Sequence, residues 1–181
     1  AVISGAGAAH TYGELGSVNA LGGSFTAALA AAVTVSWMTK LGLPVSTTQA
    51  IVGAIVGWDF FSGALIDTQT LTKIVSTWVI SPVLTGIFAF AIFKIVRYCL
   101  RVGKVHLLDI DLYTRLGLIL IGAFGAYSLG ANNIANVMGV FVAANPFRDL
   151  NFFGYFSLTG TQILFLIGGL AITVGIYTYS Y

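Results

Sequence analysis

The stretch that decides the fold reads Leu41-Gly-Leu-Pro-Val-Ser-Thr-Thr-Gln49. It places a proline and then four consecutive polar residues between segments that are apolar on both sides. Proline cannot donate the backbone hydrogen bond of a helix interior, and Ser and Thr favour the position just before a helix begins. The stretch therefore predicts a break between two helical segments.

The composition around this break is that of a membrane protein. Of the 181 residues, 57% are hydrophobic and 8% are charged, and the mean hydropathy is +0.94. A soluble domain carries about 25% charged residues, so a water-soluble globular fold is excluded. The net charge of +2 is too small to indicate a nucleic-acid surface, and the single Cys99 excludes an internal disulfide.

Five long uncharged runs predict several membrane-spanning helices, because about 20 helical residues cross a bilayer core. Five of the eight basic residues fall in residues 94–115, and we therefore expect this segment to face the cytoplasm. We expect the protein to be a multi-pass protein of the plasma membrane. We divide the chain into residues 1–93, a basic connector 94–115, and residues 116–181. The runs are residues 15–39, 41–58, 74–93, 116–147 and 150–181.

The fold class expected is an all-α polytopic helical bundle with a re-entrant hairpin at the first break. One half-helix would descend over residues 25–41, residues 42–48 would form the tip, and residues 49–62 would return. Interrupted backbone at membrane depth is tolerated only where it is buried in protein or lines a wet cavity. Two full spans with Lys40 at a surface remain the alternative.

The tip carries chemistry suited to an anion. Ser46, Thr47 and Thr48 stand at a helix start, where the first N–H groups lack partners and the dipole is positive. Their hydroxyl protons can be donated to an oxyanion, and their oxygen lone pairs can ligate a neighbouring cation. The alternative is that the hydroxyls only cap the helix.

A second polar segment, Gly130-Ala-Asn-Asn-Ile-Ala-Asn136, interrupts the run 116–147 and predicts a broken helix. Asn132 and Asn136 are four residues apart and share a helical face. Amide and main-chain oxygens suit a hard cation such as Na⁺. The alternative is that the Asn side chains hold helices together by hydrogen bonds.

The remaining polar residues predict no catalytic centre. His10, Glu14 and His106 are interpreted as interfacial or capping residues. No nucleophile, zinc or phosphate-loop motif is present, so we expect neither an enzyme nor a resident cofactor. Solvated loop positions are predicted for Asp59, Asp67, Asp109, Asp111, Arg148 and Asp149.

Together the two segments resemble the inorganic phosphate transporter (PiT) family, whose duplicated signature pairs GANDxAN with PxSTTHxxVGA. The matching stretches are LGLPVSTTQAIVGAIVGW (41–58) and SLGANNIANVMGVF (128–141). The resemblance implies two inverted repeats, each giving one hairpin and one broken helix to a central site. Because the hairpin comes first here, we expect a fragment that joins the back of repeat one to the front of repeat two. The alternative is a natural half-transporter that completes its site by association, such as a homo-oligomer.

The resemblance also implies roles for individual residues. Phosphate contact is expected from Ser46, Thr47, Thr48 and Asn132. Cation binding or coupling is expected from Asn133, Asn136 and Gln49, with Asn132, Asn133, Asn136 and Ser46 as candidate Na⁺ ligands. Asn133 stands where the family pattern has Asp, and Gln49 where it has His. The lost carboxylate weakens attraction for a cation and puts the identity of the coupling ion in doubt.

The function expected is secondary active symport that imports inorganic phosphate with co-transported Na⁺, in contact with membrane lipid. Sulfate or another oxyanion, and H⁺ coupling, are the alternatives within the family. A passive anion channel is the alternative of a different class, and a structural or receptor-like membrane protein that does not transport is another.

Overall fold

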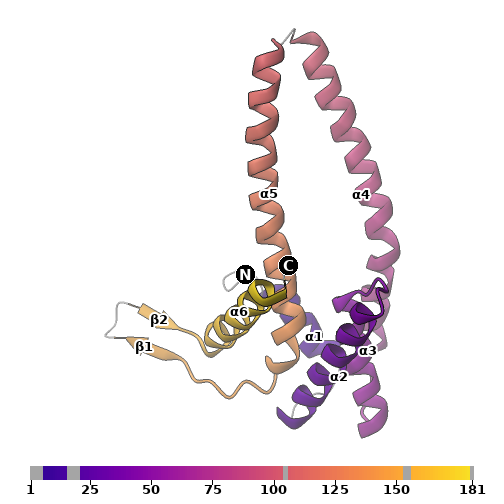
Figure 1. Ribbon diagram of the computed structural model, residues 1–181. Helices are drawn as coiled ribbons and strands as arrows, with labels where there is room; N and C mark the ends of the chain where they lie inside the picture. The colour runs from indigo at the N-terminus through magenta and orange to yellow at the C-terminus, as the bar shows by residue number, and fades with distance from the viewer. Residues whose placement is uncertain (1–5, 16–20, 104–105, 153–155, 180–181) are drawn as a thin grey trace. The chain divides into compact units, whose positions relative to one another are not determined.

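The computed structural model describes residues 6–15, 21–103, 106–152 and 156–179 (Figure 1). These residues form two compact units. The first combines residues 1–68 with 127–181, and the second comprises residues 69–126. The candidate site residues all belong to the first unit. The helices are α1 (Ala6–Leu15), α2 (Leu21–Lys40), α3 (Thr47–Ser62), α4 (Thr68–Val102), α5 (Leu107–Met138) and α6 (Gly160–Tyr179), with a 3₁₀ helix η1 (Gly139–Phe141) after α5.

The prediction of a polytopic helical membrane protein is confirmed. Four described segments are long and apolar enough to cross a bilayer: α2, α4, residues 109–141 and α6. Helix α3, with 16 residues, is about 24 Å long, which is shorter than the bilayer core of about 30 Å. Its length is that of the half-helix expected after the break.

The hairpin itself follows from local chemistry. Helix α2 ends at Lys40, and Gly42 adopts a left-handed conformation with φ of 70° that a side chain would disfavour. The Gly42 N–H donates to the Thr39 carbonyl at 3.0 Å, and the Leu43 N–H donates to the Met38 carbonyl at 3.0 Å. This paired arrangement is the Schellman motif, which satisfies carbonyls at a helix end and reverses the chain. The helix–turn–helix prediction is confirmed, and α2 begins four residues earlier than expected.

The open ends of the hairpin close by a contact between a glycine and an aromatic ring. Helices α2 and α3 lie side by side, so that the start of α2 meets the end of α3 (Figure 1). A Cβ atom at Gly23 would lie 2.7 Å from the Trp58 ring. Only glycine at this position therefore lets the ring pack on the α2 backbone.

The second predicted break does not lie where the sequence placed it. Helix α5 runs without interruption through residues 130–136 and ends at Met138, where η1 begins. The prediction of a broken helix inside residues 130–136 is therefore wrong. The three Asn side chains are accommodated within an intact α-helix. The backbone changes from α-helix to 3₁₀ helix only at Gly139.

Helix α6 is preceded by a small β-hairpin that the all-α prediction did not include. Strands β1 (Leu150–Phe152) and β2 (Phe156–Leu158) pair antiparallel, with Leu150 opposite Leu158. Helix α6 then begins with a capping box. The Gln162 N–H donates to Thr159 Oγ1 at 3.3 Å, and the Thr159 N–H donates to Gln162 Oε1 at 3.0 Å.

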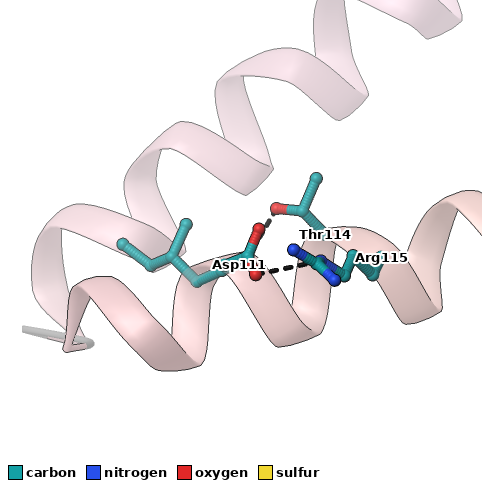
Figure 2. A network of polar contacts seen from close by, with 4 residues as sticks. Asp111, Thr114 and Arg115 are labelled. Carbon is teal, nitrogen blue, oxygen red and sulfur yellow. Dashed lines mark hydrogen bonds and ion pairs between the residues drawn. The ribbon is translucent and has the colours of Figure 1, made fainter.

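The second unit consists of most of α4 and the first part of α5. The basic connector 94–115 is largely helical, since α4 extends to Val102 and α5 starts at Leu107; Lys104 lies outside the described residues. Figure 2 shows the start of α5, where Arg115 Nε and Asp111 Oδ2 form an ion pair at 2.9 Å and the Thr114 hydroxyl lies close by.

The hairpin contact gives a stability prediction. Gly23→Ala should lower the free energy of unfolding by about 1–3 kcal/mol, because the new methyl group overpacks against Trp58. Gly22→Ala is the matched control, since a Cβ atom there meets nothing within 4 Å. That variant should be neutral or gain up to about 1 kcal/mol from helix propensity. Thermal unfolding in detergent measures both, and equal effects would contradict the packing.

Candidate functional site

Asn136, in the last turn of α5, connects three helices. Its side chain is buried, with 4% of the residue exposed. Its amide Nδ2 donates to Thr47 Oγ1 and to Thr48 Oγ1, each at 3.1 Å, and its Oδ1 accepts from the Tyr12 hydroxyl at 2.6 Å. We call Tyr12, Thr47, Thr48 and Asn136 the Asn136 cluster. Residues separated by more than 85 positions in sequence thus share one polar site.

The three hydroxyl groups at the start of α3 have different hydrogen-bond partners. Ser46 is the N-cap residue, with extended backbone, and its Oγ accepts from the Gln49 N–H at 3.3 Å. Thr47 and Thr48 then occupy the first turn, where their hydroxyls face Asn136 and their N–H groups have no partner within the helix. The positive end of the helix dipole lies at the same point. The arrangement presents donors to an anion.

Tyr12 of α1 supports the cluster from the other side. Its ring is buried against Gly139, where a Cβ atom would lie 2.7 Å from Tyr12 Cδ2. Helix α1 lies outside the four candidate spans. Burial raises the pKa of the Tyr12 hydroxyl from its usual value of 10.0, and the hydrogen bond with Thr48 opposes this rise in part. The phenol is therefore protonated at neutral pH and donates to Asn136.

The helix end beside the cluster is held by α2. The Ser24 hydroxyl, which is fully buried, donates to the Val140 carbonyl at 2.8 Å. Carbonyls at the end of a helix lack partners within it, and a buried one is costly unless it is bonded. Ser24 thus fixes η1 against the hairpin and sets the position of Asn136 relative to Thr47.

A cavity of about 320 Å³ adjoins the cluster between α2, α3 and the end of α5. Its polar lining comes from Thr47, Asn136 and Ser36, and the rest is small or apolar. A dehydrated ion in such a cavity would meet neutral hydroxyl and amide groups and the start of a helix. The apolar lining residues are Ala28, Ala31, Ala32, Val35, Ile51 and Val137.

A larger cavity of about 640 Å³ lies along another face of the same hairpin, yet it is a poorer candidate. Its threonines, Thr26 and Thr34, donate to carbonyls of their own helix at 2.8 Å. Apart from these, the polar side chain in its lining is Gln49, among small and aromatic residues. We therefore assign the candidate site to the smaller cavity.

The structure brings together three of the residues expected at the site: Thr47, Thr48 and Asn136. Gln49 lines the larger cavity instead, and Ser46 caps α3. Asn132 is exposed and Asn133 is half-buried; among the described residues, neither side chain hydrogen-bonds to the cluster.

Sequence reasoning missed Tyr12 and Ser24, and it misplaced Asp59. Tyr12 and Ser24 carry no motif, and their partners lie more than 110 residues away. Asp59 was expected in solvent, but it lies in the last turn of α3 with 0% of the residue exposed. The side chain of His10 lies outside the described ones.

The described residues include four helical segments long and apolar enough to cross a membrane, and the first unit carries a helical hairpin with a polar cluster at its tip. These features define a multi-pass helical membrane protein. The family model described as "Phosphate transporter family" matches residues 1–108, which include the hairpin. The chain belongs to this phosphate transporter family.

Curated relatives agree with this assignment. A "Putative phosphate permease" of Pyrococcus horikoshii is 40% identical over 77 residues, which cover 41% of this chain and 19% of that protein. A sulfate permease of Bacillus subtilis is 36% identical over 117 residues, covering 64% of this chain and 32% of that protein. A "Putative phosphate permease" of Chlamydia trachomatis is 30% identical over 137 residues, covering 74% and 32%. The chain thus spans between about a fifth and a third of the length of these relatives. No solved structure matches the chain.

The hydrogen bonds of Asn136 give a second stability prediction. Asn136→Ala should lower the free energy of unfolding by about 2 kcal/mol, because three hydrogen bonds between helices at about 0.6 kcal/mol each are lost. Asn132→Ala, one turn earlier and exposed, is the matched control and should change it by less than about 0.5 kcal/mol. Unfolding in detergent monitored by circular dichroism measures the difference. The cluster assignment fails if the two variants are equally stable.

Proposed function

We propose that the permease to which this chain belongs imports inorganic phosphate by symport with Na⁺. The observation that carries the proposal is the convergence of Thr47, Thr48 and Asn136 at the start of α3, beside a cavity. Membership of the phosphate transporter family and the names of the curated relatives support an oxyanion as the substrate.

The geometry supports a binding step by exchange of partners. In the structure the Thr47 and Thr48 hydroxyls accept from the Asn136 amide, and the Thr48 hydroxyl also donates to Asn136 Oδ1 at 3.4 Å, so the Thr47 proton is the one that remains available. A phosphate oxygen entering the cavity would accept from the Thr47 hydroxyl and from the first N–H groups of α3. Both donors are fixed before the ion arrives, which limits the entropic cost of binding.

Neutral oxygens in the same cluster suit the co-transported cation. Asn136 Oδ1 and the hydroxyl oxygens of Thr47 and Thr48 are hard ligands of the kind Na⁺ takes. With Asn133 in place of an acidic residue, this half of the site contributes no formal negative charge. We therefore propose that further ligands of the cation come from an inverted repeat outside this chain. We also propose that the protein lies in the plasma membrane, with residues 94–115 facing the cytoplasm.

Sulfate is the second candidate substrate. The sulfate permease of Bacillus subtilis is 36% identical to this chain over 117 residues. Phosphate at neutral pH keeps a proton and can donate it to a carboxylate, whereas sulfate has no proton to donate. A site that has Asn133 where a carboxylate is usual therefore discriminates less strongly against sulfate.

The first functional prediction concerns Thr47. In vesicles containing the full-length permease, Thr47→Ala should lower uptake of labelled phosphate at least tenfold, because a hydrogen bond to a charged ligand contributes about 1.5–3 kcal/mol. Thr47→Ser should retain most of the uptake. Thr34→Ala, a threonine of the larger cavity bonded to Ala30, is the matched control and should transport normally. Normal uptake by the Thr47→Ala variant would remove Thr47 from the site, and the same assay with labelled sulfate separates the two substrates.

The second functional prediction concerns coupling. Replacing external Na⁺ by K⁺ at fixed pH should reduce phosphate uptake to the background of empty vesicles, because the substrate would lack its co-transported charge. An imposed pH gradient without Na⁺ is the control for H⁺ coupling. Unchanged uptake in K⁺ without any gradient would contradict symport and favour a passive channel.

A further inference from the structure

One end of α4 has the form of a helix leaving a membrane. Its uncharged run, residues 74–93, lies between Lys73 and Lys94. At 1.5 Å per residue this run is about 30 Å long, which matches the thickness of a bilayer core. Lys94 therefore lies at the membrane surface, and the next two turns of α4 lie at the depth of the lipid headgroups.

Three cations occupy one face of these turns. Lys94, Arg97 and Arg101 follow each other at intervals of three and four residues, the spacing that aligns side chains on a helix. All three are exposed, and none pairs with a carboxylate in the part of the chain that the structure describes. Arg115, by contrast, is paired with Asp111 (Figure 2). Like charges this close repel each other, so an anion between them would stabilise the helix.

The same side of the helix carries a shallow, open depression. It is lined by Phe93, Val96 and Leu100 together with Arg97 and Arg101, all of which are exposed. The lining thus consists of three apolar side chains and two arginines. The surface thus combines a place for a hydrocarbon chain with a place for a phosphate group.

The side chains are directed back towards the membrane. Side chains on a helix tilt towards its N-terminus, which for this end of α4 is the direction of the bilayer. Lys94 shows this orientation, because its Nζ lies over the Phe90 ring, 5.3 Å from the centroid and one turn nearer the membrane. Arg97 and Arg101, within the two turns at headgroup depth, can likewise direct their guanidinium groups towards the lipid phosphates.

We propose that the face formed by Phe93, Val96, Arg97, Leu100 and Arg101 binds an anionic phospholipid. The headgroup phosphate lies between Arg97 and Arg101, and the glycerol and the first methylene groups of an acyl chain contact Leu100, Val96 and Phe93. Two adjacent guanidinium groups match the charge and planar geometry of a phosphodiester. A free phosphate ion would gain nothing from the apolar side chains of the depression, so the lipid is the occupant that uses the whole surface.

The test measures lipid retention by the intact protein. Wild-type chain purified from membranes in mild detergent is titrated with phosphatidylglycerol, and bound lipid is counted by native mass spectrometry. Arg97→Gln/Arg101→Gln should weaken phosphatidylglycerol binding about 30-fold, because each basic residue near an anionic lipid contributes about fivefold. Lys73→Gln/Arg115→Gln removes the same charge elsewhere and should change binding less than twofold. Phosphatidylcholine, which is zwitterionic, should bind weakly to all three proteins.

Several results would overturn the proposal. Equal phosphatidylglycerol binding by wild type and the Arg97→Gln/Arg101→Gln variant would remove these arginines from any lipid site. Equal weakening in the Lys73→Gln/Arg115→Gln variant would show that net charge alone attracts the lipid. Displacement of phosphatidylglycerol by millimolar inorganic phosphate would show that the face recognises a free ion. Circular dichroism of both variants confirms that the helices remain formed.

Discussion

The hydrogen bonds from Asn136 to Thr47 and Thr48 join the two parts of the chain on which the candidate site depends. A helix that starts in a largely apolar environment leaves N–H groups without partners, and hydroxyls beside them must also be satisfied. The amide of Asn136 supplies donors to both hydroxyls, while Tyr12 bonds its remaining oxygen. One side chain thus ties the start of α3 to the end of α5 and to α1.

Close approach of the helices makes this contact geometrically feasible. Gly23 lets Trp58 pack on the backbone of α2, which closes the hairpin, and Gly139 lets the Tyr12 ring lie against η1. Ser24 then bonds the Val140 carbonyl and fixes the end of α5 beside the hairpin. In an apolar solvent such packing and a few hydrogen bonds take the place of the hydrophobic effect as the force between helices. The polar cluster and the small residues around it therefore depend on each other.

The hairpin could be predicted from the sequence because its determinants are local. Gly42 ends α2, Ser46 caps α3, and Pro44 prevents the two helices from joining. The position of the second break could not be predicted, because Asn is tolerated in a helix when tertiary contacts satisfy its amide, as they do for Asn136. The same limit applies to Tyr12, Ser24 and Asp59. Tyr12 and Ser24 bond residues far away in the chain, and no local pattern reveals these contacts or the burial of Asp59.

We therefore propose that the uncharged polar cluster, held in place by packing, is the part of the oxyanion site that this chain contributes. The measurement that tests this most directly is a structure of the full-length permease crystallised with Na⁺ and arsenate, a heavier analogue of phosphate whose anomalous signal locates it. The account predicts an arsenate peak in the cavity beside Thr47 and Asn136, within hydrogen-bonding distance of a hydroxyl at the start of α3. A peak elsewhere in the protein, with this cavity empty, would contradict it.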